Sequence, residues 1–428
     1  MKKILHLSSY DFGGAGMAAY RLHCNLRRAG FTSRMLVAQK READDDVLQV
    51  GENAPSSRLG TFLAKARLKF CSDQDYYFQD QTRSILAQPG RILEQVGFTP
   101  DLIVVHWVSN FVSAADVRAL SLSCGAPLIW YLLDMAPLTG GCHYAWDCIG
   151  YFDTCGSCRA LRSINSYDRS HRIWREKAKA LAGIEVAVAS GSGWLDRQAR
   201  NSSLFRGREI RKILLSVDPE VFRPLPKSEA RQDLGLPQDK KVLFFGNQGL
   251  GLKRKGMTEL IEALRLLSLD PSFDAGSVLV AVAGSLPADF ELPLPFKGLG
   301  FLKGDRMLAL AYQAADVFMC PSIEDSGPMM INESIMCGTP VVAFEMGVAP
   351  DLVQPGRTGY RARLGDSADF ARGVRELLAL DAEEGAAMSA RCRELGLELL
   401  HPVRQVDAFR DLMLAVERRQ QGRNGEAT

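Results

Sequence analysis

The segment DVFMCPSIEDSGPMMINESIMCGTPVVAFE, residues 316–345, decides the fold class of this chain. Its two short apolar runs, VFMC and VVAF, are typical of buried strands, and the residues between them favour a helix. Pro328 suits the first turn of that helix, and Gly338 suits its end. A strand, a helix and a second strand in this order predict two parallel strands joined by a crossover helix.

The same alternation repeats along the 428 residues. The first half contains the apolar runs KKILHLSS, SRMLVAQ, DLIVVHW, PLIWYLL and IEVAVAS, and the second half contains KKVLFFG and SVLVAVAGS. Near-continuous apolar strands separated by helical segments predict parallel sheets that are covered on both faces. Two such series in a chain of this length predict two doubly wound, Rossmann-like α/β domains.

A segment rich in proline and charge, SVDPEVFRPLPKSEARQDLGLPQDKK, marks the domain boundary. We predict an N-terminal domain over 1–217, with a cysteine-rich insertion at 142–158, and a C-terminal domain over 218–405. The last residues, 406–428, are expected to form a helix that packs back on the N-terminal domain, followed by a tail. Because ligands bind beyond the carboxyl ends of parallel strands, two such domains facing each other would form the site in the cleft between them.

Composition narrows the class of protein. A formal net charge of +2 argues against a dominant nucleic-acid surface. No window holds 18 uninterrupted apolar residues, and the first residues suit a strand rather than a secretory signal, so we expect a cytoplasmic protein. Residues 58–70, RLGTFLAKARLKF, place apolar side chains on one helical face and basic ones on the others. That pattern fits a helix at the inner face of the membrane, and it also fits a helix packed on its own domain.

Two glycine-containing loops follow predicted strands. Gly13, Gly14 and Gly16 allow the backbone to approach a ligand, and the helix after them offers N–H groups to a phosphate. In the second half, a strand ends at Gly246 and the basic run 253–255 precedes a helix, which favours a diphosphate. The alternatives are a tight strand-to-helix turn for the first loop and a solvated basic loop for the second.

The carboxylates of the opening segment suit a ligand rich in hydroxyl groups. Asp325 and Ser326 lie at the start of the predicted helix, where backbone N–H groups meet a phosphate or a sugar. Glu333 lies about two turns further along, too deep to be a helix cap. A carboxylate accepts two hydrogen bonds and therefore suits the vicinal hydroxyls of a ribose or hexose. The alternative is a surface glutamate on a short helix.

Residues 321–344, PSIEDSGPMMINESIMCGTPVVAF, resemble the donor-binding signature of glycosyltransferase family 4, whose members are retaining enzymes of the GT-B fold. The resemblance implies that Asp325, or its neighbour Glu324, contacts the donor hexose. It also implies that Glu333 holds the ribose hydroxyls. Ser326 and Gly327, in the same loop, are expected to bind the donor as well.

Other segments carry the same resemblance. GGAGMAAYRL is similar to the N-terminal glycine loop of the family, which places Gly14 and Gly16 near the donor. Lys255 and the glycine after it match the lysine-glycine pair that binds the diphosphate. Asn247 stands where the family has an arginine, and Arg254 is the expected substitute.

WYLLDMAPLTGGCHY, residues 130–144, resembles a subgroup that builds bacterial surface polysaccharides such as colanic acid. Leu133 stands where that subgroup has a histidine before Asp134. His106, in VVHW, is a further candidate for lining the cleft, although a lone histidine at a strand end is often structural. The expected catalytic residues are therefore Asp325, Glu333, Lys255 and His106.

The resemblance implies transfer of a hexose, with retention, from a UDP- or GDP-sugar to a lipid-linked exopolysaccharide or lipopolysaccharide intermediate. The resemblance also implies that Lys255, the glycine loops and helix N–H groups stabilise the departing diphosphate, and that the transfer step needs no cofactor. Two alternatives stay open. One is a sugar-nucleotide epimerase with the same fold, and the other is a non-catalytic partner subunit, which the departures at Leu133 and Asn247 motivate.

Four of the ten cysteines cluster in the insertion: Cys142, Cys148, Cys155 and Cys158, with the spacing C-x5-C-x6-C-x2-C. Four thiolates at this spacing suit a closed, structural zinc site, whose binding energy would fold the loop. Free thiols and an iron–sulfur cluster are the alternatives, and disulfides would need an oxidising compartment.

Overall fold

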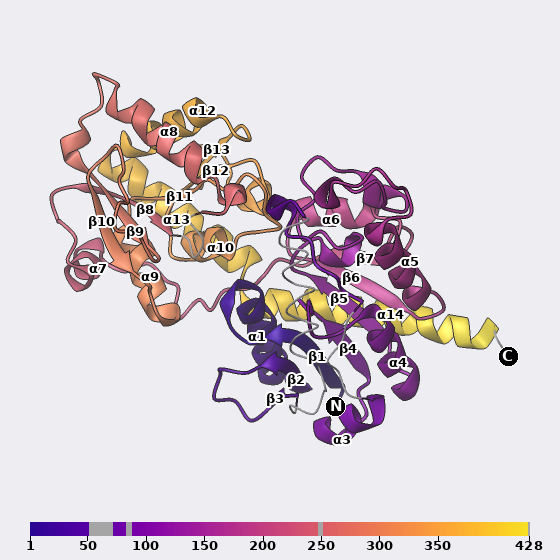
Figure 1. The fold of residues 1–428 in the computed structure, drawn as a ribbon. Helices are drawn as coiled ribbons and strands as arrows, with labels where there is room; N and C mark the ends of the chain where they lie inside the picture. Colours follow the sequence, from indigo (N-terminus) through magenta and orange to yellow (C-terminus); the bar gives the residue numbers. More distant parts are fainter. Residues whose placement is uncertain (51–71, 83–87, 247–250, 427–428) are drawn as a thin grey trace. The chain divides into compact units, whose positions relative to one another are not determined.

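The computed structural model describes residues 1–50, 72–82, 88–246 and 251–426. The chain divides into two compact units, a first unit of Met1–Leu214 with Gln405–Thr428 and a second unit of Leu215–Arg404. Each unit is built around one parallel sheet with helices on both faces (Figure 1). The predicted helix at 58–70 lies outside the described residues. Among those that are described, no helix is long and apolar enough to cross a membrane.

The first unit holds a seven-stranded sheet in the order β3-β2-β1-β4-β5-β6-β7. Strand order reverses between β1 and β4, which is where ligands bind in doubly wound sheets. Its elements are β1 (Lys3–Tyr10), α1 (Gly13–Arg28), β2 (Thr32–Gln39), β3 (Val47–Gln49), η1 (Gln74–Tyr76), α3 (Pro89–Val96), β4 (Leu102–Val105), α4 (Ala114–Cys124), β5 (Leu128–Leu132), η2 (Ala136–Leu138), η3 (Gly150–Phe152), η4 (Arg159–Leu161), α5 (Arg169–Leu181), β6 (Val186–Ser190), α6 (Gly193–Asn201), β7 (Ile210–Lys212) and α14 (Pro402–Glu426).

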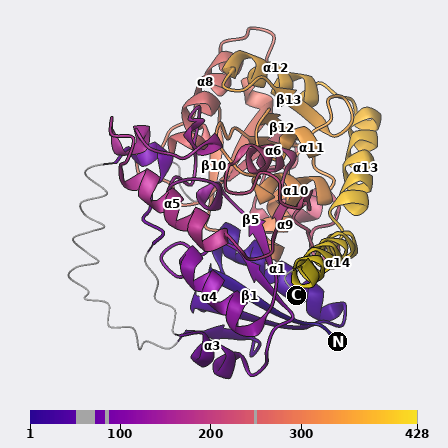
Figure 2. The ribbon, with the colours of Figure 1, turned by 90° about the vertical axis from the view of Figure 1, so that its right-hand side faces the viewer.

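The central strands β4, β5 and β6 are buried at every residue, because helices cover both faces of the sheet. Figure 2 shows α4 and α5 on one side of this sheet and α1 and α14 on the other. Helix α14 is tied to the first unit by side-chain hydrogen bonds. Gln405 Nε2 donates to Tyr131 Oη at 3.1 Å, and Gln420 Nε2 donates to the Gly125 carbonyl at 2.8 Å.

The second unit holds a six-stranded sheet in the order β10-β9-β8-β11-β12-β13, with the reversal between β8 and β11. Its elements are α7 (Lys227–Leu234), β8 (Lys241–Gly246), η5 (Lys253–Lys255), α8 (Met257–Ser268), η6 (Ala275–Ser277), β9 (Val278–Ala283), β10 (Phe296–Gly300), α9 (Gly304–Ala314), β11 (Val317–Cys320), α10 (Met329–Met336), β12 (Val341–Phe344), α11 (Ala349–Leu352), β13 (Gly359–Ala362), α12 (Ser367–Leu378) and α13 (Ala382–Leu399). The strand–helix–strand prediction for residues 316–345 is confirmed, as is the doubly wound α/β class.

Helices α8 and α12 pack on one face of this sheet, and α9 and α10 pack on the other (Figure 1). Under α9 the rings of Phe244, Tyr312 and Phe318 meet edge to face or tilted, at centroid distances of 5.2 to 5.6 Å. Such contacts add to the burial of large aromatic side chains and restrict their rotation. Tyr312 is thereby fixed in the core beside α10, where its hydroxyl is used by the site described next.

Candidate functional site

The candidate site is centred on Asp325, in the loop between β11 and α10 at the carboxyl edge of the second unit's sheet. Its side chain is buried, with Oδ2 lying 2.5 Å from Lys255 Nζ and 3.1 Å from Arg254 Nη1. The backbone N–H of Gly327 donates to Oδ1 at 3.2 Å. The structure therefore brings together four of the residues that the sequence predicted for donor binding.

Backbone contacts hold the basic turn η5 against the end of β11. The N–H groups of Ile323 and Glu324 donate to the Arg254 carbonyl at 2.9 and 3.2 Å. Gly256, which ends the turn, has a φ of +68°, and a Cβ there would lie 1.7 Å from the Pro321 carbonyl oxygen. Only glycine fits at this point, since any side chain would push the two lysines and the arginine of the turn away from Asp325.

The site carries two cations for one carboxylate. Burial by itself raises the pKa of Asp325, but Lys255 and Arg254 outweigh that effect and hold the pKa below its ordinary value. The Asp325 carboxyl is therefore ionised near neutral pH. Charge-assisted hydrogen bonds from lysine and arginine are the contacts that diphosphate oxygens favour.

Glu333 lies on α10, eight residues after Asp325, and is only 4% exposed. Tyr312 donates a hydrogen bond from its hydroxyl to Glu333 Oε2 at 3.1 Å, which satisfies part of the buried carboxylate. Burial and the adjacent Glu333 raise the pKa of Tyr312 well above its ordinary value, so its hydroxyl keeps its proton. Glu324 and Ser326 are also buried. The alternative in which Glu333 is a surface residue is wrong.

The predicted glycine loop of the first unit forms the start of α1. A Cβ at Gly16 would lie 2.8 Å from the Tyr10 carbonyl oxygen, so this glycine lets the helix approach its own preceding strand. Gly14 has no atom within 4 Å of the position of a Cβ and faces open space. Donor contacts at Gly14 and Gly16 stay a prediction. Asn247 lies outside the described residues, and its part in donor binding stays a prediction as well.

His106 lies in the core of the first unit. It is 2% exposed, and its Nε2 lies 2.9 Å from Nδ1 of His6, with the two rings stacked. Burial lowers the pKa of His106 to about 3, so the ring is neutral. It also lines a cavity of about 20 Å³, room for about one water, together with Trp107 and Asp134. This burial favours the structural alternative, and a catalytic role for His106 stays a prediction.

A hydrogen-bonded chain that the sequence did not predict lies at the carboxyl edge of the first unit's sheet. His143 Nδ1 lies 2.6 Å from Asp134 Oδ2, and His143 Nε2 lies 3.2 Å from Ser109 Oγ. Trp107 Nε1 donates to the same Asp134 oxygen at 2.6 Å. The sequence could have indicated Trp107, Ser109 and Asp134, because they lie just after β4 and β5. It could not have indicated His143, because the path of the aperiodic, cysteine-rich insertion does not follow from any sequence pattern.

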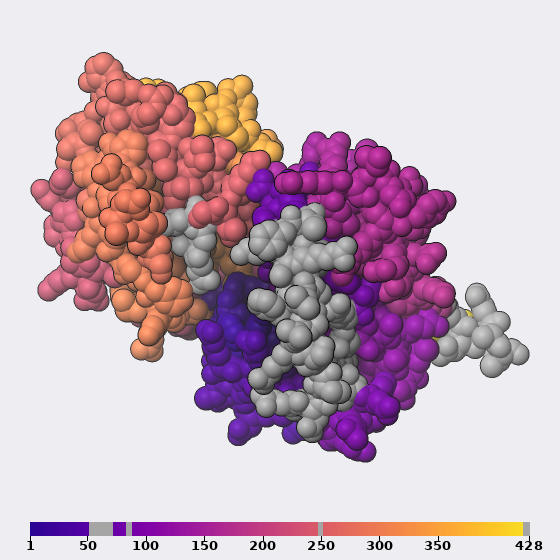
Figure 3. Space-filling view, viewed as in Figure 1, coloured from indigo at the N-terminus to yellow at the C-terminus, as the bar shows by residue number. Residues whose placement is uncertain are grey.

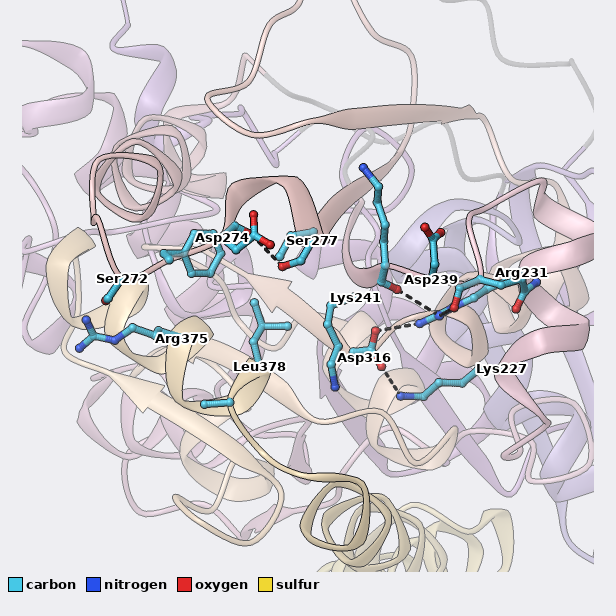
Figure 4. Close-up of a pocket in the computed structure, with 15 residues that line it drawn as sticks. Lys227, Arg231, Asp239, Lys241, Ser272, Asp274, Ser277, Asp316, Arg375 and Leu378 are labelled. Carbon is cyan, nitrogen blue, oxygen red and sulfur yellow. Dashed lines mark hydrogen bonds and ion pairs between the residues drawn. The ribbon is translucent and has the colours of Figure 1, made fainter.

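A larger hollow, of about 590 Å³, lies at the opposite, amino edge of the second unit's sheet (Figure 4). There Asp316 accepts from Lys227 Nζ at 2.6 Å, Arg231 Nη2 at 2.8 Å and the Val242 N–H at 2.7 Å. Arg231 also donates to the Ala314 carbonyl at 3.0 Å. Arg231 and Asp316 thus join α7 to the main chain at the end of α9 and the start of β8. Ligands of parallel α/β sheets bind at the carboxyl edge, so the candidate site is the Asp325 cluster.

All four cysteines of the insertion are free thiols. Within the described part of the chain, no group of three or more histidine, cysteine, aspartate or glutamate side chains stands ready to hold a metal ion. The predicted zinc site stays a prediction at this point.

Residues 239–380, within the second unit, match the family model described as "Glycosyl transferases group 1". A curated relative, D-inositol 3-phosphate glycosyltransferase from Stackebrandtia nassauensis, is 34% identical over 187 residues, which are 41% of this chain and 42% of that protein. The chain thus spans less than half the length of the curated relatives that it matches.

Two solved structures resemble almost the whole chain. Anabaena Alr3699/HepE in complex with UDP-glucose has a TM-score of 0.63 at 16% identity, over 99% of this chain and 100% of that one. WaaG, a glycosyltransferase involved in lipopolysaccharide biosynthesis, has a TM-score of 0.61 at 13% identity, over 95% and 99% of the two chains. At these identities the likeness shows the fold, which is that of the GT-B glycosyltransferases.

Proposed function

We propose that this protein is a retaining glycosyltransferase that moves a hexose from a nucleotide diphosphate sugar to a glycan acceptor. The observation that carries the proposal is the buried Asp325 held by Lys255 and Arg254, with the buried carboxylate of Glu333 eight residues further on. This cluster lies at the carboxyl edge of a doubly wound sheet and inside the segment that matches a glycosyltransferase family model.

In this proposal the diphosphate binds at the basic turn. Lys255 and Arg254 turn from Asp325 toward the diphosphate oxygens, helped by N–H groups at the start of α8. As the bond between the anomeric carbon and the diphosphate breaks, negative charge grows on the leaving oxygen, and the two cations stabilise it. The acceptor hydroxyl oxygen then bonds to the anomeric carbon on the face that the diphosphate leaves, and its proton passes to a diphosphate oxygen.

The two carboxylates have separate parts in the proposed site. Glu333 accepts hydrogen bonds from the ribose hydroxyls, with one of its oxygens oriented by Tyr312. Asp325 and the loop residues Glu324, Ser326 and Gly327 contact the hexose. A UDP- or GDP-sugar is the proposed donor. The solved UDP-glucose complex of a protein with the same fold supports the first of these.

For the acceptor we propose a lipid-linked surface polysaccharide or lipopolysaccharide intermediate. Residues 130–144 support this by their resemblance to enzymes of surface polysaccharide synthesis, and a solved protein of the same fold takes part in lipopolysaccharide biosynthesis. Such an acceptor places the protein in the cytoplasm, at the inner face of the membrane.

The test is calorimetric titration with UDP, GDP, dTDP, CDP and ADP of the wild type, Glu333→Ala and a control, Glu345→Ala. Glu345 follows β12 and has a half-exposed side chain, paired only loosely with Arg361 at 3.6 Å. We expect one nucleotide to bind, about 10- to 100-fold more weakly to Glu333→Ala, because hydrogen bonds to a charged group contribute about 1.5–3 kcal/mol. The control should bind like the wild type. A folded protein that binds none of the five nucleotides would overturn the proposal and leave the partner-subunit alternative.

A further inference from the structure

The loop between η4 and α5, residues 162–168, displays two apolar side chains to solvent. Ile164 is 98% exposed and Tyr167 is 79% exposed. This part of the first unit reaches the molecular surface in the magenta region of Figure 3. Single apolar side chains are normal on protein surfaces, so exposure by itself assigns no role to these two. The shape of the loop and the charge around it separate them from the ordinary case.

Hydrogen bonds hold the loop in place. The Ser157 N–H donates to the Asn165 carbonyl at 2.9 Å, and the Asn165 side-chain oxygen accepts from the Tyr167 N–H at 2.8 Å. The loop also lies close against the preceding turn, because a Cβ at Gly156 would lie 2.1 Å from the Ser166 carbonyl oxygen. A loop fastened to its neighbour in this way presents its apolar side chains at a fixed place on the surface.

Residues 159–179 concentrate positive charge around this loop. They contain seven arginines and lysines and two acidic residues, a formal charge of +5, whereas the whole chain carries +2. Three of the seven are engaged within the unit, two in ion pairs with aspartates and one by burial: Arg159, Arg169 and Lys177. The other four are exposed and form no ion pair with any residue that the structure describes: Arg162, Arg172, Arg175 and Lys179.

These four cations lie beside the apolar side chains. Arg162 begins the loop, and the other three share one face of α5, because they are spaced by three and four residues along the helix. The Tyr167 ring meets the ring of His171, in the first turn of α5, edge to face at a centroid distance of 5.2 Å. The helix has a single acidic residue, Glu176. The loop and this face of α5 therefore form one basic surface with an apolar tip.

An anionic lipid bilayer is the partner whose chemistry matches this surface. Lipid phosphates attract arginine and lysine, and each cation near an anionic leaflet adds to binding. Ile164 and Tyr167 would enter the boundary between headgroups and acyl chains, where tyrosine is enriched in membrane proteins. A nucleic acid would use the cations but would leave the isoleucine in water.

We propose that this surface docks the protein on an anionic membrane, with Ile164 and Tyr167 inserted at the interface and the four cations against the lipid phosphates. The inference rests on the proposed function for its purpose, because a lipid-linked acceptor is held in such a bilayer. Residues 58–70, the predicted basic amphipathic helix, lie outside the described residues and are the alternative point of contact.

The test is co-sedimentation of the full chain with vesicles of phosphatidylcholine alone or with about 30% phosphatidylglycerol. We expect the wild type to bind the anionic vesicles at least about 10-fold more tightly than the neutral ones. The double variant Arg172→Gln and Arg175→Gln should bind the anionic vesicles about 30-fold more weakly. Ile164→Ser should bind them about 10-fold more weakly. All three side chains are exposed, so these variants should keep the fold.

Each change has a matched control. The double variant Arg404→Gln and Arg418→Gln removes the same charge from exposed positions of α14, and Leu122→Ser removes an apolar side chain that is 59% exposed on α4. Both controls should bind vesicles like the wild type. Calorimetry with nucleotide should give the wild-type affinity in all of these variants, so that failure of the docking surface and failure of the proposed transferase are separate results.

Three results would overturn the inference. The first is wild type that does not bind the anionic vesicles at about 0.15 M salt, although it binds a nucleotide. The second is vesicle binding that both docking variants keep, which would leave residues 58–70 as the contact. The third is tighter binding to a single-stranded oligonucleotide than to the anionic vesicles, which would assign the cations to a nucleic acid.

Discussion

Two aspartates of the second unit, the buried Asp325 and the partly buried Asp316, make nearly the same contacts at opposite edges of one sheet. Asp316, at the amino edge, pairs with Lys227 at 2.6 Å and with Arg231 at 2.8 Å. Asp325, at the carboxyl edge, pairs with Lys255 at 2.5 Å and with Arg254 at 3.1 Å. Burial raises both pKa values, and in both cases the cations outweigh it and leave the pKa below its ordinary value.

What surrounds the arginine separates the two clusters, since the amino-edge Lys227 is itself 49% exposed. At the amino edge Arg231, whose side chain is 8% exposed, donates to the carbonyls of Ala314, Gln238 and Lys240 as well as to Asp316. At the carboxyl edge the side chains of Arg254 and Lys255 keep 18% and 23% of their surface. A cation that already holds the main chain cannot turn to a ligand, whereas one on an open turn can. The ion pairs of an aspartate therefore do not by themselves distinguish a structural cluster from a binding site.

The largest effect that we expect is a loss of stability of the first unit in acid. This loss limits the pH range in which the two aspartate clusters can be compared. Burial lowers the pKa of His23 to about 4 and of His106 to about 3, and it lowers that of His6 well below the ordinary value. In the unfolded chain these groups bind protons below about pH 6.5, so stability is complete above that pH and falls as the pH drops toward 4. Protonation in the unfolded chain should cost about 2 kcal/mol at pH 5 for each of His23 and His106, and His6 adds to the loss in the same direction.

Hydrogen exchange of the full chain at pH 7, 6 and 5 checks this expectation. After correction for the intrinsic pH dependence of exchange, β1 and β4 should lose protection while β8 and β11 keep theirs. His23→Gln, which removes one of the titrating groups, should flatten the pH dependence. Equal loss in both units would show that the buried histidines do not set the acid limit. The aspartate clusters are therefore to be compared above about pH 6.5.

Replacing each aspartate by asparagine at pH 7.5 separates the two edges by stability. Asp316→Asn leaves Arg231 as a buried cation without its counter-charge, so we expect a loss of about 3 kcal/mol. The loss at Asp325→Asn should be smaller, since its cations reach water. Hydrogen exchange of β8 and β11 in the full chain measures both. Nucleotide affinity should stay at the wild-type value in Asp316→Asn. A loss of affinity in this variant would contradict the assignment of Asp316 to a structural cluster.

Replacing each lysine by alanine separates the same edges by binding. Lys255→Ala removes a charge-assisted contact to the diphosphate and should raise the dissociation constant of the bound nucleotide about 30-fold, or about 2 kcal/mol. Lys227→Ala, the matched change at Asp316, should leave that constant unchanged. Calorimetry with the nucleotide found for the wild type gives both numbers. Equal affinities for the two variants would mean that the basic turn does not bind the diphosphate.

The sequence predicted those parts of the molecule that follow from local periodicity. Residues 316–345 showed their strand, helix and strand because two apolar runs flank a segment with Pro328 and Gly338 at its ends. The sequence did not predict the ion pair between Asp325 and Lys255. It did predict both residues for the site, since each follows a strand of the same sheet. Parallel strands bring their carboxyl ends to one edge, which is why residues far apart in sequence were predicted for one site.

Other features could be recognised only in the folded structure. His106 follows a strand just as Asp325 follows one, yet its ring turns into the core to stack on His6, and no sequence pattern fixes that rotamer. The amino-edge cluster at Asp316 was missed for a related reason. Its partners lie on α7, and the place where an amphipathic helix packs depends on the whole face that it covers.

The smallest effect concerns Tyr312, which connects the aromatic core to the carboxyl-edge site. Tyr312→Phe keeps the ring contacts with Phe244 and Phe318 and removes only the hydrogen bond to Glu333 Oε2. If that bond orients the carboxylate for the ribose, the nucleotide should bind about 5-fold more weakly, or about 1 kcal/mol. A deoxyribose nucleotide provides the control, because it lacks a hydroxyl for Glu333 to hold and should lose less affinity in the variant. If the ribose and deoxyribose forms lost affinity equally, Tyr312 would act through the general packing of α10, and the carboxyl edge would then resemble the amino edge in being built mainly for stability.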